Sequence, residues 1–335
     1  MAKQNSVSKD VLTVGVVGAG GIAENMHLPV IKNVSKLRVK FIYDKNYTRS
    51  KQMSGPYGGR AIDPDTSIDA LPECDVLLLT APVGVREDYI KEFGRRRTYI
   101  FTEKPFAASI DQHERFTNLS SYIACNYMRT EFENVGVIKD IVDAKIFGDI
   151  KRITLHETKH GHGTNRGKAT YQTKPELSGG GVLIETGSHV LSQLEHILSE
   201  FTLAVEKSSI EYVAENLDSH VDTTLIAVNG VNECIVNLKI SSVFPFRTTS
   251  VFEFEHAKLE LDPTSPSSSP RIKGDFSLSE LNIEAHSQLA RTNKQAAYLR
   301  LSNFISGVKE GEYNPVESTS YKTTELISEI ISKSK

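Results

Sequence analysis

Two successive patterns of apolar and polar positions divide the chain. Over residues 10–126, short apolar runs alternate with segments in which apolar residues recur every three or four positions. The runs predict strands and the segments between them predict helices, an order typical of an α/β fold with a parallel sheet. The first expected strand begins the stretch of residues 12–31, and the others occupy residues 37–43, 60–63, 75–80, 98–102 and 122–126.

From residue 149 onward the pattern changes to long runs in which apolar and polar residues alternate, as in strands with one buried face. Helices are expected at residues 131–147, 181–198, 287–309 and 318–333. We therefore predict a second, α+β domain with a large, mainly antiparallel open sheet. Its expected strands are residues 149–159, 209–215, 223–228, 232–242, 248–254 and 258–262.

These patterns predict one domain over residues 1–126 and a second over residues 127–335, with the last helix returning to the first domain. A chain of 335 residues is long enough for two cores. Few helices remain to cover both faces of the second sheet. We therefore expect its open face to join copies of the chain in a homodimer or homotetramer.

Composition narrows the classes of partner. Lys and Arg number 39 against 42 Asp and Glu, a net charge of −3, so no basic surface indicates nucleic acid. Cys74, Cys125 and Cys234 lack the spacing of a disulfide or zinc framework. No apolar stretch reaches the roughly 18 residues of a membrane span. These features predict a cytoplasmic protein without a membrane partner, and small polar molecules as its ligands.

A glycine-rich turn follows the first strand and opens a helix. Gly18, Gly20 and Ala23 occupy the G-x-G-x-x-[GA] positions, where the first glycine permits the turn and the second leaves room for a pyrophosphate. The amides of Gly20, Gly21 and Ile22 would then face the anion at a helix N-terminus. This motif predicts a dinucleotide site, although an ordinary glycine-rich turn has the same letters.

Asp44 ends the second strand, at the position where a carboxylate accepts hydrogen bonds from the adenosine ribose. It would repel a 2′-phosphate and so favours NAD. Lys45 and Arg49 follow closely and either could reach that phosphate, so NADP stays possible. The alternative is that Asp44 only starts a turn.

The carboxyl ends of parallel strands border the ligand crevice of such a sheet. Five further residues are expected there as cofactor neighbours because they follow strands: Thr80, Pro82, Glu103, Lys104 and Asn126.

Four sequence signatures, in order along the chain, resemble the glucose-fructose oxidoreductase, inositol dehydrogenase and rhizopine catabolism (Gfo/Idh/MocA) oxidoreductases. They are VGAGGIA at residues 17–23, EKP at 103–105, NYMR at 126–129 with FGDI from Phe147, and GGGVLIETGSH at 179–189. The resemblance implies a doubly wound Rossmann domain joined to an open α+β domain. It also implies hydride transfer between a nicotinamide and a hydroxyl-bearing carbon of a sugar or cyclitol.

Such a reaction needs a group that removes or donates the hydroxyl proton. Lys104, at a strand end, and His189 are the candidates for this acid-base pair, in either order of use. Glu185 stands four residues before His189 on the expected helix, where it would hold a substrate hydroxyl or orient His189. Ser178 is the expected N-cap of that helix.

The chain departs from the pattern it resembles. The family usually has Asp where Glu185 stands, often a second Asp at Ser192, and often His at Arg86. These departures leave a non-catalytic NAD(P)-binding sensor as an alternative function. NAD-assisted glycoside cleavage, which also occurs within the resembling superfamily, is another.

Three histidines invite a metal interpretation, because His156, His160 and His162 would share one face of a strand. No carboxylate or Cys recurs at ligand spacing and glycines interrupt the segment, so a substrate-facing loop is preferred and no metal is expected. Lys159, Arg166 and Lys168 nearby would suit an anionic sugar, or form a solvated loop.

Overall fold

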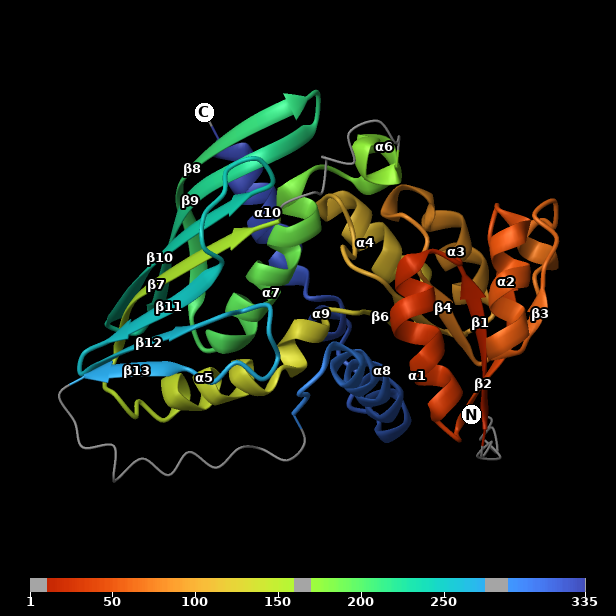
Figure 1. The fold of residues 1–335 in the computed structure, drawn as a ribbon, viewed down its shortest axis with the longest axis horizontal. Coiled ribbons are helices and arrows are strands. Elements are labelled where there is room, and N and C mark those ends of the chain that lie inside the picture. Colours follow the sequence, from red (N-terminus) through yellow and green to blue (C-terminus); the bar gives the residue numbers. More distant parts are fainter. Residues whose placement is uncertain (1–10, 160–169, 275–288, 335) are drawn as a thin grey trace.

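The structure is a computed structural model, which describes residues 11–159, 170–274 and 289–334. Its first domain is a parallel sheet between two layers of helices (Figure 1). The strand order is β3-β2-β1-β4-β5-β6, and every pairing is parallel. This doubly wound order confirms the predicted Rossmann sheet. The strands are β1 Leu12–Val17, β2 Leu37–Tyr43, β3 Arg60–Ala61, β4 Val76–Leu79, β5 Tyr99–Thr102 and β6 Ile123–Cys125.

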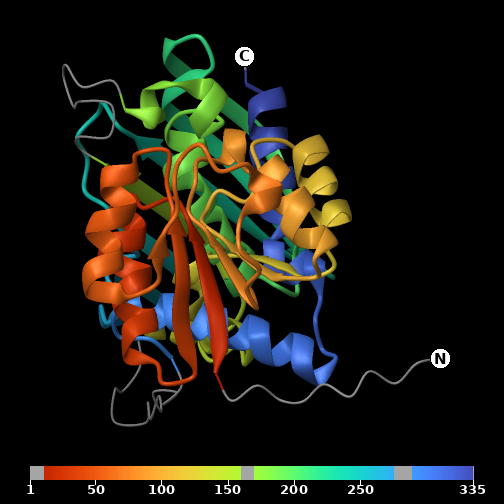
Figure 2. The ribbon, with the colours of Figure 1, turned by 90° about the vertical axis from the view of Figure 1, so that its right-hand side faces the viewer.

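Strand β4 shows how this sheet is buried on both faces. Its side chains alternate, so that Val76 and Leu78 belong to one apolar cluster and Leu77 and Leu79 to the other. Helices α1 (Leu28–Asn33) and α2 (Tyr47–Tyr57) contribute to the first cluster, and α3 (Glu87–Arg95) and α4 (Ile110–Leu119) to the second. Figure 2 shows these helices on opposite sides of the strands.

A helix from late in the chain completes the first of these layers. Leu301 and Phe304 of α8 (Asn293–Glu310) pack in the same cluster as β1 and α1. The final helix, α10 (Tyr321–Ser332), instead places Leu326, Ile327 and Ile330 in the core of the second domain. The helix that returns to the Rossmann sheet is therefore α8, followed by the short α9 (Pro315–Thr319).

The second sheet has seven strands in the order β13-β12-β11-β7-β10-β9-β8. Neighbours are antiparallel except β7 and β10, which pair in parallel from Arg152 with Ile235 to Thr158 with Ser241. The expected mainly antiparallel sheet is confirmed, with one parallel pair at its centre. The strands are β7 Ile150–Thr158, β8 Thr202–Ala214, β9 Leu217–Asn229, β10 Asn232–Ser241, β11 Thr249–Phe254, β12 Ala257–Leu261 and β13 Arg271–Gly274.

The hairpin of β8 and β9 is much longer than predicted. Each strand has 13 residues, whereas only residues 209–215 and 223–228 were expected to be extended. Residues 202–205 do alternate, with Leu203 and Val205 buried, but polar residues 206–209 interrupt the pattern. The four-residue β13 was not predicted because RIKG carries a single apolar residue.

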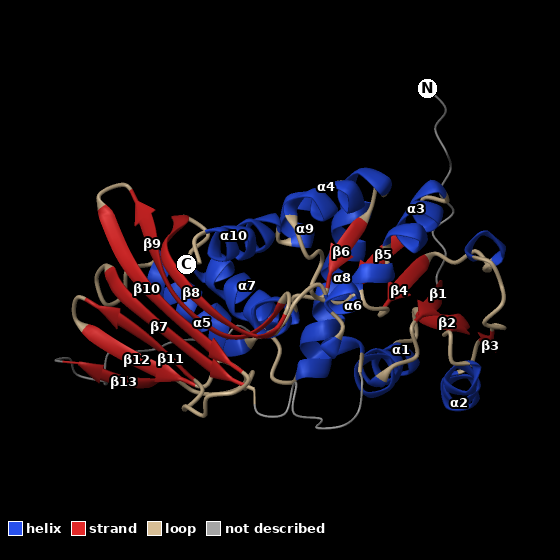
Figure 3. Ribbon diagram, turned by 90° about the horizontal axis from the view of Figure 1, so that it is seen from above, coloured by secondary structure: helices blue, strands red, loops and turns tan. Residues whose placement is uncertain are grey.

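All helices of the second domain that the structure describes lie on one side of its sheet, toward the Rossmann domain (Figure 3). They include α5 (Glu133–Asp143), α7 (Ser188–Ile197) and α10. Ile153 and Leu155 of β7 face these helices, so Thr154 and His156 point to the opposite face. We call that opposite side of the sheet the outer face.

Candidate active site

The glycine-rich turn is built as the sequence predicts. Gly18 has a φ of +97°, and a Cβ there would lie 2.8 Å from both Ala81 N and Thr80 Oγ1. Thr80 donates a 2.6 Å hydrogen bond to Gly18 O, which fastens the turn to the end of β4. A Cβ on Gly20 would meet no atom within 4 Å, so the space above this residue is open. Gly18 is thus required by the fold, and Gly20 leaves room for a ligand.

The helix after this turn begins with a π-helical segment, Ala23–His27, before α1. Gly20, Gly21 and Ile22 are exposed at its start, where backbone amides have no acceptor within the helix. Asp44, at the end of β2, accepts a 2.6 Å hydrogen bond from Ala19 N. The carboxylate therefore lies beside the turn, as expected from its position after the second strand. Lys45, the next residue, is exposed.

Glu103, the residue after β5, is buried in a polar network. Its Oε1 lies 2.6 Å from His27 Nε2 and accepts a 2.8 Å hydrogen bond from Asn126 Nδ2, while Oε2 accepts from Lys104 N. Asn126 Oδ1 is buried and has no partner among the described residues. This network joins the helix after the turn to the ends of β5 and β6.

A cavity of about 350 Å³ lies between the two domains. From the Rossmann domain it is lined by residues that include Ile22, Thr80, Pro82, Glu103 and Lys104, so that the turn and the ends of β4 and β5 meet there. Asn126, which follows β6, is absent from the described lining. From the second domain it is lined by residues that include Lys159, Tyr171, Gln172, Glu185, Val213, Leu217 and Asp218.

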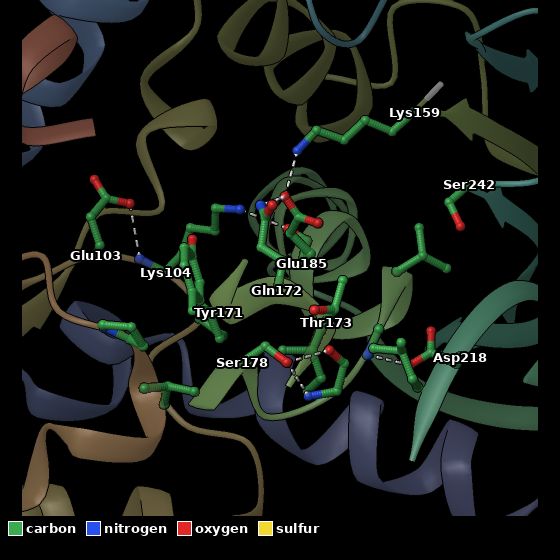
Figure 4. A pocket seen from close by; sticks show the side chains of 18 of the residues that line it. Glu103, Lys104, Lys159, Tyr171, Gln172, Thr173, Ser178, Glu185, Asp218 and Ser242 are labelled. Atoms are coloured by element: carbon green, nitrogen blue, oxygen red, sulfur yellow. Dashed lines mark hydrogen bonds and ion pairs between the residues drawn. The ribbon is translucent and has the colours of Figure 1, made fainter. Parts of the chain in front are cut away.

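Lys104 and Glu185 meet in this cavity (Figure 4). Lys104 Nζ donates a 2.8 Å hydrogen bond to the backbone oxygen of Glu185. Burial and, after it, the nearby charge of Lys159 lower the pKa of Lys104 to about 8, against the opposing effect of Glu185 and Glu103. An amine with this pKa can gain or lose a proton near neutral pH.

Two residues that precede Glu185 in the sequence bind its carboxylate. Its Oε1 lies 2.9 Å from Lys159 Nζ and accepts a 3.1 Å hydrogen bond from Gln172 Nε2. Gln172 lies in a short 3₁₀ turn, Tyr171–Thr173, before α6 (Pro175–Ser178). The Glu185 carboxylate thus holds Lys159 and this turn at the wall of the cavity.

His189 is more deeply placed than the sequence suggested. It is 8% exposed, it is absent from the described lining of the cavity, and its Nδ1 has no partner among the described residues. Burial, together with the charges of Arg129 and Lys104, holds the pKa of His189 well below its usual range. The imidazole is therefore neutral at pH 7. Ser192 donates to His189 O and so serves the helix backbone.

The start of the helix that carries Glu185 is capped by a residue we did not predict. Asp218 of β9 accepts hydrogen bonds from Gly181 N at 2.7 Å and Leu183 N at 2.6 Å. Ser178, the expected N-cap, instead ends α6 and donates to Gly180 O. The expectation was wrong because the capping carboxylate comes from a strand that is distant in the sequence. The helix itself opens with a π-helical segment, Leu183–Gly187.

Two arginines, one buried and one partly buried, also shape the site. Arg86 is 2% exposed and donates to the backbone oxygens of Ala81, Glu103 and Pro105, which clamps the loop that carries Lys104. Arg129 makes a two-point ion pair with Glu157 of β7, at 2.7 and 2.8 Å. Arg86 was expected only as a departure from the family pattern, and Glu157 was not singled out, because neither contact has a local signature in the sequence.

The described residues show no group of three His, Cys, Asp or Glu side chains placed as a metal site requires. His156 lies on β7 with its ring beside Phe246, whereas His160, His162, Arg166 and Lys168 fall outside the described residues. None of the helices in residues 11–159, 170–274 and 289–334 is both long and apolar enough to cross a bilayer.

Two family models match consecutive parts of the chain. The oxidoreductase family with an NAD-binding Rossmann fold (GFO_IDH_MocA) matches residues 12–122, and the GFO/IDH/MocA C-terminal domain matches residues 136–257. The chain belongs to the GFO/IDH/MocA oxidoreductase family. Its glycine-rich turn is accordingly that of an NAD(P)-binding domain, as the sequence predicted.

Individual relatives of this GFO/IDH/MocA chain have low sequence identity or match only part of it. An uncharacterised oxidoreductase of Bacillus subtilis is 30% identical over 108 residues, 32% of the chain and 31% of that protein. D-glucoside 3-dehydrogenase of Escherichia coli is 20% identical over 201 residues, 58% of the chain and 56% of that protein. The chain thus spans about a third and about half of these two relatives.

Solved structures of the GFO/IDH/MocA fold align over nearly the whole chain. A 3-ketoreductase from Actinomadura kijaniata, crystallised with NADP and TDP-benzene, has a TM-score of 0.79 and 16% identity, with 97% of the chain and 98% of the other covered. At this identity the likeness concerns the fold, which includes both domains.

Proposed function

We propose that the protein transfers a hydride between NAD(P) and a hydroxyl-bearing carbon of a sugar, sugar derivative or cyclitol. The observation that carries this proposal is Lys104. Its amine, with a pKa lowered to about 8, lines a cavity between the glycine-rich turn and the second domain. A proton acceptor or donor near neutral pH is what oxidation of an alcohol, or reduction of a ketone, requires beside the hydride carrier.

The residues present fit a dinucleotide. Open space above Gly20 and the amides of Gly20, Gly21 and Ile22 would receive its pyrophosphate, and Asp44 its adenosine ribose. Thr80, Pro82 and Glu103, which line the cavity, would border the nicotinamide end, and Asn126 would support Glu103, to which its amide donates. When bound, the nicotinamide supplies or accepts the hydride.

Lys104 and His189 are proposed as the acid-base pair. In alcohol oxidation, neutral Lys104 takes the hydroxyl proton as the hydride leaves carbon, and in ketone reduction the ammonium returns it. His189 lies behind the cavity and is neutral, so its share of the proton transfer would need one of its ring nitrogens to reach the reacting oxygen. Glu185 is the proposed positioning group, because it holds both Lys159 and Lys104.

The cavity suits an uncharged polyol. Among the described residues that line it, three basic side chains are matched by three acidic ones: Lys104, Lys159, Arg86, Glu103, Glu185 and Asp218. The relative named D-glucoside 3-dehydrogenase is named for a substrate of this neutral class. A neutral sugar, glycoside or cyclitol is therefore our proposed substrate class, in place of an anionic sugar.

The proposal is tested with a panel of sugars, glycosides, sugar nucleotides and inositols. Each is incubated with NAD and with NADP, and nicotinamide absorbance is followed while the products are separated. Oxidoreduction predicts one reduced dinucleotide for each keto product. Free sugar without net reduced dinucleotide would indicate glycoside cleavage, and tight dinucleotide binding with no turnover of any polyol would indicate a sensor.

We also propose that the outer face of the second sheet joins two or four copies of the chain. The described helices cover only the other face, and the outer face carries apolar side chains such as Ile226 and Ile235 on paired strands.

A further inference from the structure

Arg49, in the first turn of α2, lies against the glycine-rich turn. Its Nε donates a 3.0 Å hydrogen bond to Ala19 O, and its Nη2 lies 2.7 Å from Glu24 Oε2. Glu24 belongs to the π-helical segment that follows the turn. Both side chains are about one-third exposed, at 31% for Arg49 and 39% for Glu24. The guanidinium is thus held at the turn with its charge balanced by one neighbouring carboxylate.

Asp44 binds the same residue, Ala19, through its backbone N–H. Its Oδ2 accepts from Ala19 N at 2.6 Å, and its Oδ1 accepts from Asn46 N at 2.7 Å. A carboxylate and a guanidinium therefore lie together where Rossmann domains hold the adenosine ribose. In these domains a carboxylate binds the 2′-hydroxyl of NAD, whereas an arginine accommodates the 2′-phosphate of NADP.

Glu24 would compete directly with a 2′-phosphate for the guanidinium of Arg49. A 2′-phosphate needs the charge and the free donors of Arg49, and Glu24 occupies one of them. We propose that Glu24 sets the cofactor preference of this protein, by holding Arg49 in an ion pair that NADP must break. The inference rests on the proposed function, because it assumes that this crevice binds NAD(P).

The expected size of the effect follows from exposure. A partly exposed ion pair contributes little, so its loss should change affinity by about three- to tenfold rather than by orders of magnitude. Wild type should therefore prefer NAD, since Asp44 repels the 2′-phosphate and Arg49 is engaged. Removal of the Glu24 charge should release Arg49 and move the preference toward NADP.

The test compares dissociation constants of NAD and NADP, measured by calorimetry, for wild type, Glu24→Gln, Arg49→Met and the double variant. Glu24→Gln should raise NADP affinity relative to NAD about three- to tenfold. Arg49→Met alone should leave the ratio of the two affinities within about twofold, and in the double variant it should abolish the gain. Asp143→Asn is the matched control, because it removes the same charge from an ion pair with Lys139 on the other domain.

Several results would overturn the inference. The first is an unchanged ratio of NADP to NAD affinity in Glu24→Gln, and the second is an equal gain in affinity for both cofactors. The third is a gain in NADP affinity that persists without Arg49, which would assign the phosphate to another cation such as Lys45. A selective loss of NADP in Arg49→Met, which needs no Glu24 variant to fold, would show that Arg49 already binds the phosphate. If folded wild type binds neither dinucleotide, the proposed function itself fails, which is a different result.

Discussion

Lys104 of the Rossmann domain donates its side-chain hydrogen bond to the backbone oxygen of Glu185 in the second domain, at 2.8 Å. The amine is therefore positioned by a backbone oxygen, which a substitution of the Glu185 side chain does not remove. Glu185 adds a second function through its carboxylate, which holds Lys159 beside the amine. Because like charges repel, Lys159 helps to lower the pKa of Lys104.

We predict that Lys104→Ala lowers turnover by about 10²- to 10⁴-fold, the usual loss when a positioned acid-base group is removed. Dinucleotide affinity should stay within a few-fold. Alcohol oxidation by wild type should rise as pH increases through about 8, because only neutral Lys104 accepts a proton. The measurement is a pH profile of kcat/KM. Lys104→Arg keeps the charge but does not lose it near pH 8, so retained activity with the same profile would contradict the role of Lys104.

Glu185→Gln keeps the backbone oxygen that holds Lys104 and removes the charge that holds Lys159. We therefore expect the pH profile of alcohol oxidation to shift, because the pKa of Lys104 loses an opposing negative charge and falls. A rise in KM larger than the fall in kcat would indicate that Glu185 also holds a substrate hydroxyl. An unchanged pH profile would show that its charge does not reach Lys104.

Gly20→Val should fold, since a Cβ at residue 20 meets no atom within 4 Å. The branched side chain would fill the open space above the turn, and we expect dinucleotide binding to be lost. Calorimetry with NAD and NADP measures this. The control is Gly58→Ala, which lies after α2 and also has no atom within 4 Å of its Cβ, although its φ of +77° costs some stability. Unchanged affinity in folded Gly20→Val would remove the turn from the cofactor site.

Local sequence patterns predicted the turn, the parallel strands and the strand ends that meet at the cavity. Gly18, Gly20 and Lys104 were found because a single strand, turn and helix determine where each lies. Asp218, Arg86 and Glu157 were not assigned, because their contacts join segments that are remote in sequence. Ser178 shows the same limit, since it satisfies the local rule for an N-cap although Asp218 supplies the cap. The roles of Lys104, His189 and Glu185 in turnover stay predictions.

We predict that the free energy of unfolding falls in acid because of His113. Its ring nitrogens lie 2.8 and 2.9 Å from the hydroxyls of Thr324 and Thr319, so this residue joins α4 to the C-terminal helices. Burial lowers the pKa of His113 to about 4, from an ordinary value of 6.5. The unfolded chain therefore binds the proton first as pH falls, and the folded state loses about 2 kcal/mol between pH 7 and pH 5 from this residue.

The measurement is chemical denaturation at pH 7 and pH 5 for wild type and His113→Gln. The variant should be less stable at pH 7 but should lose less stability between the two values. His196, whose pKa burial also lowers to about 4, contributes equally to both proteins and cancels in the comparison. Equal losses in wild type and variant would show that His113 is not the titrating group.

The outer face of the second sheet provides the last prediction. Cys234 and Val236 of β10 are buried in the core, so Ile235 between them points outward, opposite Ile226 of β9. If copies of the chain associate through this face, light scattering at micromolar concentration should give a dimer or tetramer, and Ile235→Asp should give the monomer because the charge would be buried unpaired. Val231→Asp is the control, since Val231 is fully exposed, at 101%, between β9 and β10. A monomeric wild type, or an oligomer that survives Ile235→Asp, would show that the outer face is not the interface.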